Sequence, residues 1–334
     1  MPLKSDITIN APQFDAASAP KGTLEANNKL TEMMKEGPKW FEVGAAKYRE
    51  MRWNNQTPLP RPPVIESGVN FKIPSRDSGR ELPCRMFKPE NGEPKGVFLH
   101  IHGGGFTLNS EGFQDGYLKF LADNMTVTVI SVGYRLAPED PFPAAPNDCV
   151  DAAEYLLKEG AKYGGKLLFI GGESAGGHLS VVTTFELLRT HSEPLPLKGL
   201  ILNYGVYDCA VFLPQAHTIA TPAIINLPIM FRYNDAFAPN TTIEQRRDPM
   251  YSPIYENLFK FKGRLPPALF TCGTEDPLLD DTTLMSLKWM AAGGEAVVKI
   301  YPGAPHGFSL FPAKMYEAAS QVNEHIKEFM LEKL

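Results

Sequence analysis

The sequence predicts an α/β fold: a mostly parallel, eight-stranded sheet flanked by helices on both faces, with a helical cap that folds over the sheet. Short apolar runs alternate with helix-like segments from about residue 96 to the end of the chain. Some of these runs, such as 127–132, consist almost entirely of β-branched residues, which is typical of strands buried on both faces. Pro-interrupted segments rich in aromatic residues break the alternation, and we expect them to form the cap.

Changes in pattern divide the chain into four parts: cap helices in 1–55, split by Pro38 into two; a first core part in 56–204; a cap insertion in 205–255; and a second core part in 256–334. The expected strands are 69–73, 82–87, 96–101, 127–132, 166–170, 197–202, 268–272 and 296–301. The expected core helices are 112–123, 145–159, 175–189, 279–292 and 316–334. Because no long helix separates the first two strands, we expect them to form an antiparallel edge.

Composition excludes several classes of function. The 334 residues include 33 Lys and Arg and 38 Asp and Glu, which gives a net charge of −5. The sequence has no run of basic residues of the kind that binds nucleic acid. The N-terminus has no signal-like apolar core and no stretch is suited to stable membrane insertion. Four scattered cysteines match no metal or disulfide pattern, so we expect buried thiols and a cytoplasmic location.

The pentapeptide Gly-Glu-Ser-Ala-Gly at 172–176 lies between an expected strand and an expected helix. A nucleophilic serine needs such a sharp strand-to-helix turn for its hydroxyl to project, and glycines two residues before and after it avoid collisions. A glycine-rich helix start that merely binds an anion is the alternative. The context therefore favours Ser174 as a nucleophile.

A second motif, His-Gly-Gly-Gly at 102–105, directly follows the strand expected at 96–101. Successive glycines let the backbone approach a ligand and present N–H groups, which acyl transfer needs where the oxyanion forms. A flexible turn would not explain why these glycines follow a buried strand at the edge where open α/β sheets bind ligands.

One of the seven histidines, His306, stands in a Pro/Gly-rich loop just after the strand expected at 296–301, where a side chain can reach over the sheet. We therefore predict that His306 is the general base. The acid should follow the preceding strand, and Asp276 does so in a turn made rigid by Pro277; its neighbours Glu275, Asp280 and Asp281 are rivals. The order Ser174, Asp276, His306 is the one expected of α/β-hydrolases.

Five motifs together resemble the hormone-sensitive-lipase-like carboxylesterases of the α/β-hydrolase fold. They are HGGGF at 102–106, YRLAPEDPFPAA at 134–145, GESAGG at 172–177, EDPLLDD at 275–281 and PHGF at 305–308. The resemblance implies that Ser174, Asp276 and His306 form a catalytic triad. It also implies an oxyanion hole formed by the N–H groups of Gly104, Gly105 and Ala175, with Gly103 adjacent.

The same resemblance extends to the surroundings of the site. It implies that the N-terminal helices and the insertion form the cap, and that Arg135 and Glu139 brace the floor of the site. It allows a homodimer through the last strand and helix, although the apolar residues of that helix would equally cover the sheet of a monomer. Glu173, before the nucleophile, is a departure from the Asp or Thr more frequent in the family, and we expect it to reorganise the hydrogen bonds behind the turn.

The expected function is hydrolysis of short- to medium-chain carboxylic esters, small-molecule substrates, through an acyl-enzyme, with no metal or organic cofactor. Phe212, Met230 and Phe231 are candidate substrate-binding residues, unless they only pack the cap on the core. The resemblance leaves two other functions open. One is amide hydrolysis, as in arylformamidases, and the other is ligand binding without catalysis, as in hormone receptors of this fold that lack the catalytic histidine.

Overall fold

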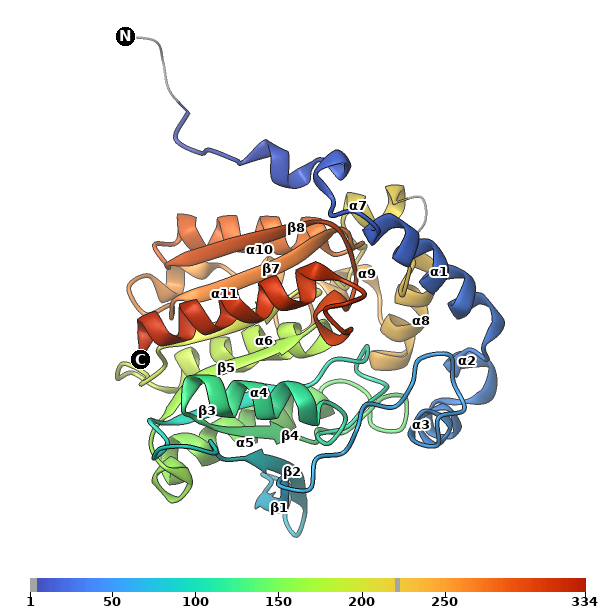
Figure 1. The fold of residues 1–334 in the computed structure, drawn as a ribbon. Coiled ribbons are helices and arrows are strands. Elements are labelled where there is room, and N and C mark those ends of the chain that lie inside the picture. Colours follow the sequence, from blue (N-terminus) through green and yellow to red (C-terminus); the bar gives the residue numbers. More distant parts are fainter. Residues whose placement is uncertain (1–4, 220–222) are drawn as a thin grey trace.

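The computed structural model describes residues 5–219 and 223–334; residues 1–4 and 220–222, which belong to the two expected cap segments, lie outside the described residues (Figure 1). One eight-stranded sheet forms the centre, in the order β1-β2-β4-β3-β5-β6-β7-β8, and β3 to β8 run parallel. β2 pairs antiparallel with both β1 and β4, so the expected antiparallel edge is confirmed. The strands are β1 Val69–Pro74, β2 Glu81–Phe87, β3 Val97–Ile101, β4 Thr128–Val132, β5 Leu167–Glu173, β6 Gly199–Asn203, β7 Ala268–Glu275 and β8 Ala296–Pro305.

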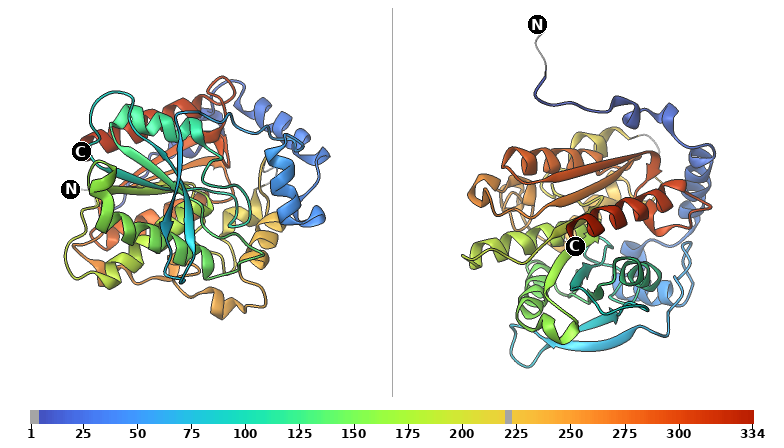
Figure 2. Two further views of the ribbon diagram at one scale, coloured as in Figure 1. Left: turned by 90° about the horizontal axis from the view of Figure 1, so that it is seen from below. Right: turned by 60° about the vertical axis from the view of Figure 1, so that its left-hand side comes forward.

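Helices cover both faces of the sheet, as predicted (Figure 2). The core helices are α4 Asp115–Met125, α5 Ala144–Glu159, α6 Ala175–Thr190, α10 Leu279–Ala291 and α11 Glu317–Lys333. Alternate residues along each strand serve opposite faces: Phe98 packs with α4 and α11, whereas Leu99 packs with α5 and α6. The two apolar layers bury every residue of the inner strands β3, β4 and β6, which explains their largely apolar sequences.

Two segments that are distant in sequence lie side by side at one end of the sheet, drawn in blue and gold in Figure 1. They comprise α1 Thr23–Glu36, α2 Trp40–Val43 and α3 Ala45–Trp53, together with α7 Pro214–Thr218, α8 Leu227–Phe237 and α9 Ile243–Arg246. Trp40 stacks on Tyr233 with ring centroids 5.0 Å apart and joins the two segments. The prediction of two N-terminal helices was wrong, because Gly44, at φ +89°, separates α2 from α3.

β8 forms the edge of the sheet opposite β1, and the start of the chain lies against it. The short helices η1 Ala11–Phe14 and η2 Ala16–Ser18 contact β8, and the amide of Asn27 in α1 donates to the carbonyl of Gly303 at 2.9 Å. The apolar residues of α11, such as Val322 and Ile326, are fully buried against the sheet of the same chain. They therefore serve the monomer's core, and a homodimer stays a prediction.

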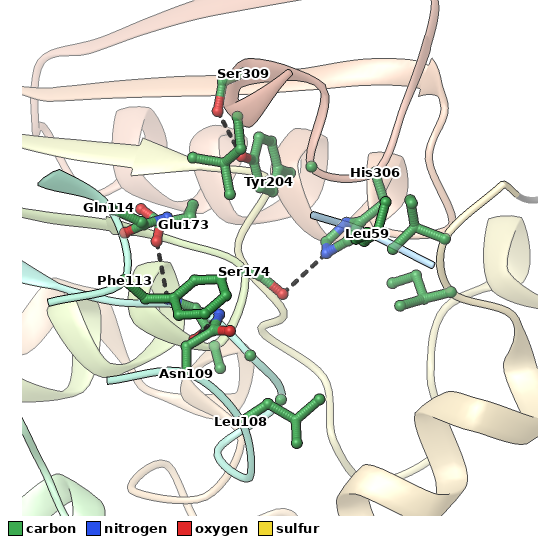
Figure 3. A pocket seen from close by; sticks show the side chains of 18 of the residues that line it. Leu59, Leu108, Asn109, Phe113, Gln114, Glu173, Ser174, Tyr204, His306 and Ser309 are labelled. Carbon is green, nitrogen blue, oxygen red and sulfur yellow. Dashed lines mark hydrogen bonds between the residues drawn. The ribbon is translucent and has the colours of Figure 1, made fainter. Parts of the chain in front are cut away.

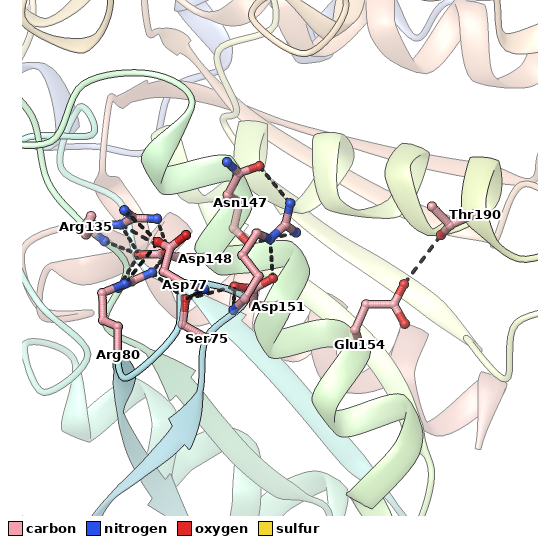
Figure 4. Close-up of polar contacts among 10 residues, drawn as sticks. Ser75, Asp77, Arg80, Arg135, Asn147, Asp148, Asp151, Glu154 and Thr190 are labelled. Carbon is pink, nitrogen blue, oxygen red and sulfur yellow. Dashed lines mark hydrogen bonds and ion pairs between the residues drawn. The ribbon is translucent and has the colours of Figure 1, made fainter.

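Arg135, expected to brace the site, belongs to an ion-pair network between the turn that joins β1 to β2 and the first half of α5 (Figure 4). The buried carboxylate of Asp148 accepts hydrogen bonds from the guanidinium groups of both Arg135 and Arg80. Glu139 pairs instead with Arg49 of α3 at 2.7 Å. The network thus holds the loop after β4 to α5, and Glu139 joins this loop to an N-terminal helix.

All four cysteines are buried free thiols, as expected. Across residues 5–219 and 223–334, no helix combines the length and the apolar character that crossing a bilayer requires. The same residues contain no group of three or more His, Cys, Asp or Glu that could hold a metal ion.

Asp281 in the first turn of α10 holds the start of the insertion. Its Oδ1 accepts from the N–H of Tyr207 and, at 2.8 Å, from that of Asp208. The side chain is fully buried, and this burial raises its pKa well above the ordinary carboxyl range. Its structural need is therefore an acceptor for two backbone donors, rather than a negative charge.

We expect Asp281→Ala to lower the free energy of unfolding by about 3 kcal/mol, because it leaves two buried N–H groups unpaired. Asp281→Asn keeps an acceptor oxygen without the charge and should stay within about 1 kcal/mol of the wild type. Urea unfolding of the three proteins measures both differences. An equal decrease in the free energy of unfolding of the two variants would contradict this role for the backbone hydrogen bonds.

Candidate active site

Ser174 occupies a strained turn between β5 and α6, at φ +56° and ψ −120°. A side chain at residue 172 or 176 would collide with the Ile101 carbonyl of β3, since a Cβ atom would lie 2.0 Å or 1.9 Å from that oxygen. Glycine at both positions removes the collision, and the N–H of Ser174 donates to the Asn203 carbonyl at 2.9 Å. The turn therefore projects the serine hydroxyl beyond the carboxyl end of the sheet.

The structure brings the three candidate triad residues together. The Ser174 Oγ lies 3.0 Å from His306 Nε2 (Figure 3). On the other side of the ring, His306 Nδ1 lies 2.9 Å from Asp276 Oδ2. Asp276 is fully buried and His306 is 6% exposed. Because an ionised carboxylate can only accept, Nδ1 carries the imidazole proton, and Nε2 is free to accept the proton of Ser174. The geometry is that of a nucleophile, a base and an orienting acid.

Two rivals for the acid have other partners. Asp280 accepts from the N–H of Gln215 at 2.8 Å, and Asp281 holds the backbone of 207–208. Asp276 itself also accepts from the N–H of Leu278, which fixes the carboxylate within its turn. On the other side of the imidazole, the ring of Tyr204 packs edge-on against His306.

The glycine loop after β3 borders the same pocket as Ser174. The N–H of Gly103 donates to Glu173 Oε1 at 2.8 Å, so this N–H is already engaged, and Gly103 lies beside the expected oxyanion donors without being one of them. The N–H groups of Gly104, Gly105 and Ala175 have no hydrogen-bond acceptor within the part of the chain that the structure describes. These three N–H groups remain available to a ligand.

Glu173 connects the turn to the glycine loop through a buried network. Its second carboxylate oxygen lies 3.2 Å from His100 Nε2, and His100 Nδ1 lies 3.0 Å from the Ser131 hydroxyl. Burial alone would raise the pKa of Glu173, but the interaction with His100 and the hydrogen bond from Gly103 hold this pKa below its usual value. An ionised carboxylate thus fixes the position of the first loop glycine.

The remaining candidate histidines have structural surroundings. His102 stacks on Tyr134 and contacts the Gly103 carbonyl, and His178 bonds to the Val206 carbonyl. Burial lowers the pKa of both imidazoles to about 4, so they are neutral near pH 7. They support the glycine loop and the helix after Ser174.

A pocket of about 650 Å³ opens above Ser174. Phe212 and Met230 line it, as predicted. Phe231 does not: its ring packs against that of Phe212 with centroids 5.0 Å apart, behind the pocket wall. Its candidate substrate-binding role was therefore wrong, because the helical turn of α8 points Met230 inward and its neighbour away.

Sequence reasoning missed several residues that border the pocket. Among these are Arg52 and Arg61 from the N-terminal region, Leu108 and Phe113 after the glycine loop, and Ile225 of the insertion. No motif marks them.

Comparison with known proteins places this geometry in context. A family profile described as alpha/beta hydrolase fold matches residues 98–310. An ethyl acetate hydrolase of Pseudomonas putida is 28% identical over 254 residues, 75% of this chain and 78% of that protein. A Pyrobaculum calidifontis esterase superposes with a TM-score of 0.72 at 26% identity, over 95% of this chain and 93% of its own. A hormone-sensitive lipase from a metagenome library superposes with a TM-score of 0.78 at 24% identity, over 94% and 99%. The resemblance noted in the motifs is thereby confirmed, together with the fold that it implies.

Glu173 offers a test of the network behind the site. Glu173→Ala removes the acceptor for the Gly103 N–H, and we expect it to lower kcat on p-nitrophenyl acetate about 100-fold, the effect of losing an oxyanion donor. Glu173→Gln keeps an acceptor oxygen for the Gly103 N–H, so we expect its kcat to fall by less than about tenfold. Steady-state kinetics and thermal melts of both variants check this. Unchanged kcat in a folded Glu173→Ala protein would contradict the positioning role.

Proposed function

This chain belongs to the alpha/beta hydrolase fold family, and on that premise we propose that it is a serine carboxylesterase. One observation carries the proposal: the contact of Ser174 with His306, which is itself oriented by Asp276, at the floor of a pocket bordered by free backbone N–H groups. Relatives named as an ethyl acetate hydrolase and an esterase support it.

In the proposed reaction, His306 takes the Ser174 proton while Oγ attacks the ester carbonyl carbon. The developing oxyanion accepts from the N–H groups of Gly104, Gly105 and Ala175, each worth about 10²–10³ in rate. His306 then protonates the leaving alcohol, and an acyl group remains on Ser174. Water, activated by His306, attacks this acyl-enzyme, and the carboxylic acid leaves as the serine is restored.

The pocket supports a preference for short to medium acyl chains. Its volume of about 650 Å³ falls within the usual size of a small-molecule site, and its lining is mostly apolar, with Ile224, Ile225 and Met230 from the insertion. We propose that α1–α3 and α7–α9 together act as the cap that encloses this pocket.

The other expectations remain proposals. Four buried thiols are consistent with a cytoplasmic location. The homodimer expected through the last strand and helix remains a proposal, and the apolar residues Val322 and Ile326 of α11 are occupied within the chain. Neither a metal nor an organic cofactor is needed for the steps above.

A series of p-nitrophenyl esters from acetate to palmitate tests the proposed function. We expect kcat/KM to fall steeply with long chains, because they exceed the pocket. Ser174→Ala and His306→Ala should each lower kcat by about 10⁴-fold or more, since the triad acts as a unit. Ser320→Ala, on the exposed face of α11, is the matched control and should keep full activity.

A folded wild type that is inactive on every ester would reject the esterase proposal. Formamide substrates would then be tested next, because the same triad can cleave an amide. Inactivity on these as well would indicate ligand binding without catalysis.

A further inference from the structure

The pocket contains two arginines that have no carboxylate partner. Most arginines of this chain form an ion pair, Arg49 with Glu139 and Arg85 with Asp115 among them. Four arginines form none within the described residues, namely Arg52, Arg61, Arg232 and Arg264. Only the first two of these line the pocket above Ser174.

Arg52, in the last turn of α3, lies beside the glycine loop. Its Nη1 donates to Asn109 Oδ1 at 2.9 Å, and Asn109 Nδ2 donates to the Gly103 carbonyl at 3.0 Å. The guanidinium also lies over the ring of Phe113, 4.5 Å from its centroid. Figure 3 shows Asn109 and Phe113, the two partners of Arg52, close to Ser174. The side chain of Asn109 alone therefore separates the Arg52 guanidinium from the glycine loop beside Ser174.

This guanidinium has unused hydrogen-bonding capacity. Of its five N–H donors, one has an acceptor among the described residues. Burial lowers the pKa of Arg52, yet the group remains charged at any physiological pH. A cation that is partly removed from water without a counter-ion gains more from an anionic ligand than a hydrated one does.

Arg61 adds a second charge from the connector after α3. Its guanidinium lies 4.6 Å from the centroid of Trp53, and its Nη1 makes one long hydrogen bond, 3.3 Å, to the Trp53 carbonyl. Pro60, Pro62 and Pro63 flank it in the pocket lining and restrict the backbone that carries it. The remaining donors of Arg61 have no acceptor within the part of the chain described.

No opposite charge in the pocket neutralises the pair. Among the described lining residues the sole carboxylate is Glu173, whose two oxygens face Gly103 and His100. The insertion contributes an apolar wall instead, which includes Phe212 and Met230. The cavity thus offers cations from the N-terminal region, apolar contacts from the insertion, and no free negative charge.

We propose that the preferred substrates are carboxylate-bearing esters, such as the monoesters of dicarboxylic acids, whose free carboxylate binds Arg52 and Arg61 while the ester carbonyl lies at Ser174. The inference rests on the proposed esterase function and names its substrate class. Guanidinium groups bind carboxylates through paired N–H donors, so the contact supplies orientation as well as affinity. Cationic esters are disfavoured by the same two charges.

Matched ester pairs test the proposal. The first pair tests the acyl side: mono-4-nitrophenyl adipate carries a free carboxylate at the end of its acyl chain, and methyl 4-nitrophenyl adipate carries none. 4-Carboxyphenyl butyrate is compared with its methyl ester, for the alcohol side. In at least one pair we expect the anionic ester to have the higher kcat/KM by about tenfold, as for a hydrogen bond to a charged group. Added NaCl should reduce this ratio.

The variants locate the effect. Arg52→Gln and Arg61→Gln should each reduce the anionic-to-neutral ratio severalfold, while Arg52→Lys, which keeps the charge, should retain part of it. A substitution that only disturbs the glycine loop lowers kcat/KM equally for both esters of a pair, so the anionic-to-neutral ratio stays unchanged. Arg232→Gln is the control, because Arg232 is exposed, lacks an ion pair among the described residues and lies outside the pocket lining.

The outcomes separate the two proposals. If the wild type cleaves the neutral esters but shows no anionic preference in either pair, or if its ratio is unchanged in both glutamine variants, the anion site is rejected and the esterase stands. If a folded wild type cleaves no ester at all, 4-nitrophenyl acetate included, the proposed function itself fails.

Discussion

The close approach of β3 to the turn after β5 is the constraint on which the rest of the site depends. The Ile101 carbonyl comes so near residues 172 and 176 that a Cβ atom at either would lie within 2.0 Å of it. Glycine at both allows the strand, the turn and α6 to pack against the end of β3. Ser174 is then held at φ +56° and the glycine loop begins beside it. One backbone contact therefore places the nucleophile and the loop together.

Glu173 converts this proximity into a fixed arrangement. Its ionised carboxylate is buried, a costly situation unless every oxygen has a partner, and here Gly103 and His100 supply the partners. The residue before the nucleophile thereby uses the first N–H of the glycine loop and leaves those of Gly104 and Gly105 available. The longer side chain of Glu, noted as a departure in the sequence, reaches across to the neighbouring strand for this purpose.

The proposed chemistry and the proposed selectivity belong to different parts of the molecule. The reacting groups follow strands of the rigid sheet, whereas much of the pocket wall comes from the N-terminal helices and the insertion. The N-terminal region contributes Arg52 and Arg61, and the insertion contributes an apolar surface that includes Met230. Trp40 joins these two segments by stacking on Tyr233, which lines the pocket. The same core could accept other substrates with a different cap.

The order of strands and helices, and the nomination of Ser174, Asp276 and His306, could be made from the sequence because they rest on local patterns: each residue follows a recognisable strand. Which partners a group finds was decided by tertiary structure. Gly103 meets a carboxylate 70 residues away, Phe231 lies behind Phe212, and Arg52 reaches the glycine loop from another segment. Periodicity reports the face of an element that is buried, but the groups facing it belong to elements distant in the chain, and no local pattern encodes that pairing.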